Sequence, residues 1–320
     1  MKPGRSCPLH YRYAPEAFRA EAAPHLQSLE VLYVVGGLYG NELALERVLD
    51  LFEREGGRKR LVFNGDFHWF DVDPATFARV QRRVLAHEAL RGNVETELAA
   101  PGSDEDAGCG CAYPAWVGDG VVERSNRILL RLRRAATQAQ QAELAALPMW
   151  LRADVGPMRL GIVHGDATSL AGWGFAQEHL RDAMHRETVA GWLDRAGVDA
   201  FACTHTCLPV FQALGPAGGR ERRWIVNNGA TGMPNFAGDR AGLLTRVAVT
   251  PFRGPERRFG ILAASGAIHI DAIGVEFDAD AWLQRFCQDW PPGSDAHASY
   301  FERIAKGPDY DPEAAVRARG

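Results

Sequence analysis

The stretch LVFNGDFHWFD, residues 61–71, opens with the apolar run Leu61, Val62 and Phe63 and breaks at Gly65-Asp66. A short apolar run of this kind is typical of a strand that is buried on both faces. Asp66 is therefore expected at the carboxyl end of a strand. In open α/β sheets, ligands bind at that edge, because the crevice lies outside the carboxyl ends of the strands.

The same arrangement occurs three more times along the chain. Apolar runs are followed by Gly92-Asn93, by His164-Gly165-Asp166 and by Thr204-His205-Thr206-Cys207. Each of these segments presents a side chain that is able to hold a metal ion. Such strands alternate with helical patterns at residues 42–55 and 74–90, which predicts parallel strands joined by right-handed crossovers.

Composition excludes several classes of protein. With 320 residues and 46% hydrophobic content, the chain can bury a large core, and its net charge of −4 indicates no nucleic-acid partner. The first residues lack the apolar core of a signal peptide, and no apolar stretch is long enough to span a bilayer. We therefore expect a cytoplasmic protein without membrane association. Six cysteines in a chain of this length do not predict a disulfide scaffold.

Three segments are expected from the order of these patterns. Residues 1–30 are interpreted as an N-terminal surface arm, residues 31–290 as a single domain with an insertion at about 98–120, and residues 291–320 as a C-terminal helix and tail. A long helix is predicted from residue 122 to about 147. In the insertion, Cys109 and Cys111 can bind a soft metal, form a redox couple or serve only to shape the loop.

The order of the motifs resembles that of the calcineurin-like metallophosphoesterases, in particular their small bacterial and archaeal branch. The resemblance covers about residues 31–249. It implies an α/β fold in which two mixed β-sheets form a sandwich flanked by helices, with metals at the strand ends. The matching segments are Gly37-Leu38-Tyr39-Gly40-Asn41, Gly65-Asp66, Gly92-Asn93, Leu147-Pro148, His164-Gly165, residues 204–209 and residues 227–232.

The resemblance also implies two metal sites. The family's second metal corresponds to Asp66, Asn93, His164 and His205, and all four ligand types are present. The first metal corresponds to Gly37, Tyr39, Asp66 and Cys207, where the family has Asp and His in place of Gly37 and Tyr39. Cys207 is a possible thiolate ligand. His68 either rebuilds the first site with Cys207 or forms an aromatic wall of the pocket with Trp69 and Phe70.

The resemblance implies a metal-dependent hydrolase of a phosphate ester, either a diester or a monoester, in which a metal-activated water attacks phosphorus in line. One or two divalent Mn, Fe or Zn ions are expected per chain. Asp66 and His205 are the predicted catalytic residues, and Tyr39 and Asn41 are predicted to bind a small phosphorylated substrate. The alternative is a catalytically degraded relative that binds a metal and a phosphorylated ligand without turnover.

Overall fold

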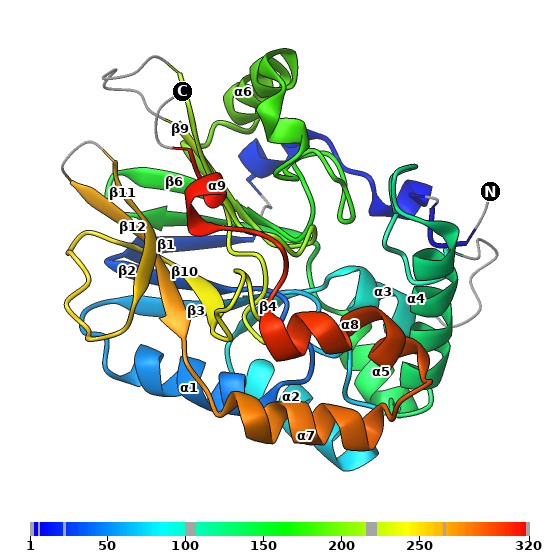
Figure 1. Cartoon of the computed structure of the whole chain (residues 1–320). Coiled ribbons are helices and arrows are strands. Elements are labelled where there is room, and N and C mark those ends of the chain that lie inside the picture. Colours follow the sequence, from blue (N-terminus) through cyan, green and yellow to red (C-terminus); the bar gives the residue numbers. More distant parts are fainter. Residues whose placement is uncertain are drawn as a thin grey trace.

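The computed structural model describes residues 3–5, 7–21, 24–99, 107–215, 223–264 and 267–317 (Figure 1). Within these ranges the strands form two mixed sheets. One has the strand order β1-β5-β6-β7-β9-β8-β13, and the other has the order β11-β12-β10-β2-β3-β4. The predicted sandwich of two mixed sheets flanked by helices is confirmed.

The first sheet consists of β1 (His25–Leu29), β5 (Trp150–Val155), β6 (Met158–Val163), β7 (Ala200–Cys203), β8 (Val210–Leu214), β9 (Arg223–Asn227) and β13 (Val316–Arg317). The second consists of β2 (Val31–Val35), β3 (Lys59–Asn64), β4 (Glu88–Leu90), β10 (Gly242–Ala248), β11 (Arg258–Ala264) and β12 (Ile268–Val275). The helices are α1 (Glu42–Glu53), α2 (Pro74–Val84), α3 (Asn93–Ala99), α4 (Asp119–Leu132), α5 (Gln138–Ala145), α6 (Ala183–Ala196), α7 (Ala279–Asp289), α8 (Asp295–Lys306) and α9 (Pro312–Ala315).

The apolar residues of β2 show how the layers are built. Leu32 and Val34 face the other sheet and pack in a core with residues such as Leu160. Tyr33 and Val35 face the opposite way and pack against helices of the chain, as the two-residue period of a strand requires. In Figure 1, α1, α2 and α7 lie below this sheet, while α6 lies on the outer side of the other one. The sheets therefore form the two inner layers, and helices form the outer ones.

Parallel pairing brings the predicted functional segments together. β2 pairs in parallel with β3 and β3 with β4, while β6 pairs in parallel with β7 and β7 with β9. The carboxyl ends of these strands therefore lie at one edge of each sheet. Two hydrogen bonds join the edges, because Asn64 Nδ2 donates to Val163 O at 2.7 Å and His164 Nδ1 donates to Asn64 O at 2.9 Å.

The N-terminal segment is not confined to the surface. Its residues His25–Leu29 form β1, which pairs in parallel with β5 at the edge of the sheet. Tyr11 and Phe18 are fully buried, and the Phe18 ring lies 4.7 Å from that of Trp150. The segment is thus part of the domain, since it covers a sheet edge and an apolar surface that would otherwise face water.

The C-terminal segment is also more ordered than a helix followed by a tail. Val316 and Arg317 form β13, which pairs in parallel with β8. Tyr310 Oη donates to Pro209 O at 2.9 Å, which ties the connection before β13 to the same sheet. Residues 318–320 lie outside the described residues.

The single helix predicted from residue 122 to 147 is two helices, α4 and α5. The second helix begins after Thr137, whose hydroxyl accepts from Gln140 N while the Gln140 side chain accepts from Thr137 N. Such a capping box defines a helix start.

Arginines of α4 hold the C-terminal helix α8 in place: Arg124 donates to Ser299, and Arg127 forms an ion pair with Asp295. No helix in the described ranges is long and apolar enough to cross a bilayer.

Candidate metal centre

Three buried side chains converge where the two sheets meet. Asp66 follows β3, His164 follows β6 and His205 follows β7, and one ligand atom from each lies within 4.8 Å of the others. Asn93, at the start of α3, adds an amide oxygen, because its Oδ1 lies 3.1 Å from His164 Nε2. The structure thus brings together all four side chains that the resemblance assigns to the second metal.

The backbone around Asp66 is held in an uncommon conformation. Asp66 has φ +53°, in the left-handed region, and it follows Gly65 with φ +78°. The buried carboxylate of Glu95 accepts from the backbone N–H groups of Asp66, Gly92 and Phe67 at 2.7, 2.9 and 3.0 Å. Glu95 therefore clamps the loops after β3 and β4 to each other. It acts on the backbone of these loops and leaves the ligand atoms free.

Hydrogen bonds fix the tautomers of both histidines. His164 Nδ1 faces the carbonyl oxygen of Asn64, and His205 Nε2 faces that of Cys111 at 3.1 Å. A carbonyl oxygen only accepts, so these ring nitrogens carry the hydrogens. When the rings are neutral, His164 Nε2 and His205 Nδ1 present lone pairs to each other across 3.1 Å. A metal-ligating histidine commonly has its other nitrogen bound in this way.

Four atoms with lone pairs face one another at the centre when both rings are neutral. Besides the two ring nitrogens, Asp66 Oδ2 lies 3.4 Å from His164 Nε2, and Asn93 Oδ1 lies beside the same atom. Burial and the neighbouring His164 lower the pKa of His205 to about 3. Burial alone would lower the pKa of His164, but the Asp66 carboxylate outweighs it and the pKa is raised. A positive charge is favoured here, and a divalent cation satisfies all four groups at once.

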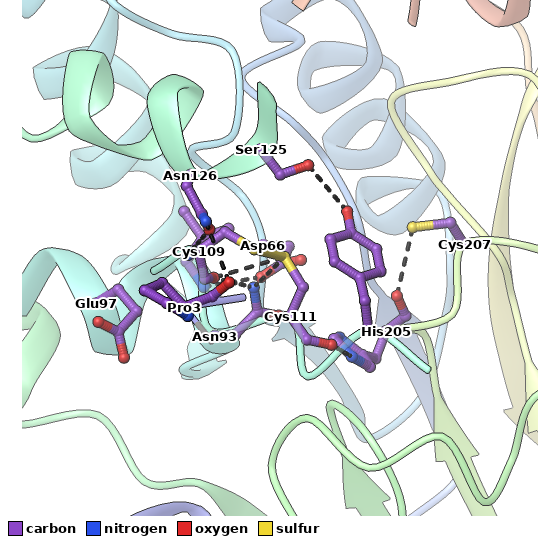
Figure 2. The surroundings of a disulfide bond; sticks show 12 residues. Pro3, Asp66, Asn93, Glu97, Cys109, Cys111, Ser125, Asn126, His205 and Cys207 are labelled. Atoms are coloured by element: carbon purple, nitrogen blue, oxygen red, sulfur yellow. Dashed lines mark hydrogen bonds between the residues drawn. A yellow bond between two sulfur atoms is a disulfide. The ribbon is translucent and has the colours of Figure 1, made fainter. Parts of the chain in front are cut away.

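The insertion between α3 and α4 forms one wall of the centre. Cys109 and Cys111 are joined by a disulfide bond (Figure 2). Asn93 Nδ2 donates to Cys109 O at 2.9 Å, which turns its Oδ1 toward His164, and the Cys111 carbonyl fixes His205. Residues 100–106 of the expected insertion lie outside the described residues. The CxC sequence marks this loop, but the contacts of its two carbonyl groups could not be foreseen.

His68 lies outside the cluster of ligand atoms. Its ring stacks on Phe77 of α2 with centroids 3.7 Å apart, and its Nδ1 is bonded to Asp71 Oδ2 at 2.8 Å. His68 is fully buried and packs against Phe77, and it is not among the residues that line the pocket beside the metal centre, although its neighbour Trp69 is. The structure does not bring His68 to Cys207.

Asn41, a predicted substrate-binding residue, caps α1. Its Oδ1 accepts from Ala44 N at 3.0 Å and its Nδ2 donates to Gly232 O at 3.0 Å, and the side chain is fully buried. Both polar atoms are thus used inside the protein. Tyr39, by contrast, lines a pocket of about 180 Å³.

The pocket opens onto the metal centre. Asp66, Asn93 and His205 form part of its lining, and aromatic side chains form much of the rest. Trp173, Tyr300 and Arg303 line it as well and were not predicted, because they lie outside every motif and come together only in the folded chain. Further lining residues are Trp69 and Tyr113.

Comparison with solved structures agrees with this architecture. A metallophosphoesterase from Sphaerobacter thermophilus matches with a TM-score of 0.53 at 15% identity, over 88% of this chain and 100% of that one. The chain has a metallophosphoesterase fold. A hypothetical protein from Pyrococcus horikoshii matches with a TM-score of 0.55 at 14% identity, over 88% and 99% of the two chains. No family model matches the sequence, and no curated protein does.

In this metallophosphoesterase fold, the positions expected to hold the first metal are filled differently. Tyr39 Oη lies 2.9 Å from Cys207 Sγ, so these two side chains hydrogen-bond to each other. A Cβ atom added at Gly37 would lie 2.9 Å from the Tyr39 ring. The tyrosine ring therefore occupies the space into which a side chain at position 37 would project. Burial raises the pKa values of both Tyr39 and Cys207, which disfavours an anionic ligand at either position.

Proposed function

We propose that the protein is a metal-dependent hydrolase of a phosphate ester, either a diester or a monoester. The observation that carries this proposal is the convergence of His164 Nε2, His205 Nδ1, Asn93 Oδ1 and an Asp66 carboxylate oxygen at the end of the pocket. Two imidazoles and two oxygen ligands suit Mn, Fe or Zn. The fold supports the class of reaction, and the pocket supports a small phosphorylated substrate.

When bound, such a metal supplies a Lewis acid for a phosphoryl oxygen and lowers the pKa of water. The chain's own residues have distinct tasks in this proposal. Asp66, Asn93, His164 and His205 hold the ion, and Asp66 and His205 also face the pocket, where the substrate's phosphate lies. The aromatic side chains Trp69, Tyr113 and Trp173 keep water away from the reacting group, which strengthens electrostatic attraction inside the pocket.

The alternative function is binding of a metal and a phosphorylated ligand without turnover. One specific observation favours it: Tyr39 and Cys207 satisfy each other where two ligands of a first metal are expected. With a single metal, the bridging geometry that activates the nucleophile in two-metal centres is lost. The two proposals share the same metal ligands and differ in whether product forms.

One experiment distinguishes the hydrolase from the binding protein. It measures metal content per chain together with hydrolysis of a generic phosphodiester and a generic phosphomonoester. We expect wild-type protein to hold one metal, His164→Ala to lose it together with hydrolysis, and Cys207→Ala to keep it. His185→Ala is the matched control, because His185 also donates a ring N–H to a backbone carbonyl, that of Gly174, but does not belong to the centre.

Each result has a defined meaning. Metal binding without hydrolysis of either ester would support the binding protein. Wild-type protein that binds no Mn, Fe or Zn at all would contradict the assignment of the centre. Two metals in wild type, one of them lost in Cys207→Ala, would mean that Cys207 contributes to a rebuilt first site.

A further inference from the structure

Arg303 of α8 is a cation that lines the pocket. Its Nη2 donates to Cys207 O at 2.6 Å and its Nε donates to Pro234 O at 3.1 Å. These partners are neutral carbonyl groups. In the described part of the chain, no carboxylate lies within 4.0 Å of its guanidinium nitrogens, whereas Arg127 of α4 forms an ion pair with Asp295 and Arg124 donates to the Ser299 hydroxyl. The charge of Arg303 is thus left without a partner of opposite sign.

This charge lies beside the positions expected to hold the first metal. Arg303 holds the backbone of Cys207, and the Cys207 thiol is bonded to Tyr39. Arg303, Cys207 and Tyr39 also line the same pocket as the metal ligands Asp66, Asn93 and His205.

We propose that Arg303 takes the place of the first metal as the cation that binds the phosphoryl oxygens of the substrate. The centre would then contain one metal, held by Asp66, Asn93, His164 and His205, and one arginine. This inference rests on the proposed function, since it names the group that recognises the phosphate at the same site.

The chemistry of arginine suits this task. A guanidinium has five N–H groups in a planar fork, and two of those of Arg303 are engaged with carbonyls, which leaves three for a ligand. The fork matches two oxygens of a phosphate, and its charge does not titrate in the physiological range. A metal ion at this position supplies charge as well, but it needs anionic or imidazole ligands, which Gly37 and the Tyr39–Cys207 pair do not provide.

The support of Arg303 is rigid. α8 is fixed to α4 by the Arg127–Asp295 ion pair at 2.7 Å and by the hydrogen bond from Arg124 to Ser299. Tyr300, one helical turn before Arg303, also lines the pocket and lies edge-on to Trp69. The guanidinium is therefore held in place before a ligand arrives, which reduces the entropy lost on binding.

Inorganic phosphate is the probe for a direct test by isothermal titration calorimetry on the full chain, with metal content measured on the same samples. We expect Arg303→Gln to weaken phosphate binding by roughly 10- to 100-fold, as for loss of a charged hydrogen-bond donor. Its metal content should remain at the wild-type level. Arg303→Lys keeps the charge but not the fork, so its phosphate affinity should lie between those of wild type and Arg303→Gln.

Arg19→Gln is the matched control. Arg19 also donates from Nε and Nη2 to two backbone carbonyls, those of Arg195 and Asp194, but it lies away from the pocket. We expect this variant to bind phosphate as wild type does. Thermal unfolding of each variant checks that it is folded. If Arg303→Gln is not folded, the phosphate affinity of Arg303→Lys decides the test.

The outcomes separate this inference from the proposed function. Phosphate affinity within twofold of wild type in a folded Arg303→Gln protein of equal metal content would overturn the role of Arg303, whether or not the protein hydrolyses esters. A second metal bound by wild-type protein beside Cys207 would overturn it too. Phosphate binding that is lost in Arg303→Gln, in a protein without hydrolysis, would support the anion site while contradicting the hydrolase.

Discussion

At Gly37, the missing side chain and the Tyr39 ring depend on each other. An added Cβ atom would lie 2.9 Å from three atoms of the tyrosine, and Gly37 has φ +64°, which favours glycine. Both differences from the Asp-x-His motif thus have one steric explanation. A chain that acquires Tyr39 can no longer accept a side chain at position 37 without moving the ring.

This dependence predicts non-additive effects on stability. Gly37→Asp alone should lower the free energy of unfolding by about 2 kcal/mol, because it adds backbone strain and a steric clash. With Tyr39→His the clash is removed, since the shorter imidazole ring lacks the outer atoms of the phenol. The double variant should therefore lose less unfolding free energy than the two single variants lose in sum.

Urea unfolding of the two single variants and the double variant measures this coupling, and metal content tests its chemical meaning. We expect the double variant to bind an additional metal ion, since it restores both residues of the motif. Strictly additive free energies would contradict the steric explanation. Metal content equal to that of wild type would show that the two residues alone do not rebuild a first site.

His68 gives a second prediction at this scale. Replacing it with alanine removes the stack on Phe77 and leaves the buried Asp71 carboxylate without its partner. A buried acceptor that loses its hydrogen-bond donor costs about 2 kcal/mol of stability. The metal content of folded His68→Ala protein should equal that of wild type, as should that of Phe77→Leu, which disturbs the stack alone. Loss of metal only in His68→Ala would restore His68 as a ligand.

Among the elements, α2 shows how one side chain defines a helix start. Asp73 Oδ1 accepts from Thr76 N at 2.8 Å and from Thr76 Oγ1 at 2.9 Å. The backbone hydrogen bond from Thr76, followed by its hydroxyl, lowers the pKa of Asp73 below 3.8. A lowered pKa in the folded state means that the carboxylate stabilises the fold above its unfolded pKa. This contribution is lost as the pH falls through the folded value.

Asp73→Ala should therefore cost about 1 kcal/mol at neutral pH, the usual value of an N-cap. The difference from wild type should shrink steadily below about pH 4, where the aspartate becomes protonated. Asp73→Asn keeps a capping oxygen without the charge, so we expect its stability to be near that of wild type at neutral pH. The contribution of the cap itself should then not depend on pH, because the amide does not titrate. Thermal unfolding of the three proteins between acidic and neutral pH measures both effects. A stability difference between wild type and Asp73→Ala that stays constant with pH would show that the charge of Asp73 does not contribute.

The elements also show what a sequence can predict about this site. The strands before Asp66, His164 and His205 were predictable because each is a local apolar run that ends in a polar turn, and parallel pairing then gathers their ends. Strands β1 and β13 were not, because their pairing depends on distant sheet edges that are invisible in a short window. The disulfide between Cys109 and Cys111 was only one of three possibilities for that pair.

Individual site residues divide in the same way. Asn93 was predictable from its place after a strand, but the carbonyl of Cys109 that orients its amide was not. Arg303 and Trp173 had no local signal, since an arginine in an amphipathic helix and a tryptophan between glycines are common on any surface. Only the docking of α8 and of the loop after β6 brings them to the pocket.

For the whole molecule, the centre is a junction between the two sheets. Asp66 and Asn93 come from one sheet edge, and His164 and His205 come from the other. An ion held by all four should stabilise the folded chain, because the ligand set does not exist once the sheets separate. Free metal at about 100 times its dissociation constant adds about 2.7 kcal/mol, which corresponds to a rise of roughly 4 °C in Tm for a chain of this size.

Calorimetry of metal-loaded and chelator-treated protein measures this shift. We expect it in wild type and in the control His185→Ala, and not in His164→Ala. An equal shift in His164→Ala would place the stabilising ion elsewhere in the protein.

The position of α8 late in the sequence has a consequence for biosynthesis. The ribosome makes the strands that carry Asp66, Asn93, His164 and His205 first, and it makes Arg303 after every other residue of the pocket. Domains generally fold as units, N-terminal ones first during synthesis. The growing chain therefore contains all four metal ligands before it contains Arg303, and the pocket is complete only once α8 has been made and has docked.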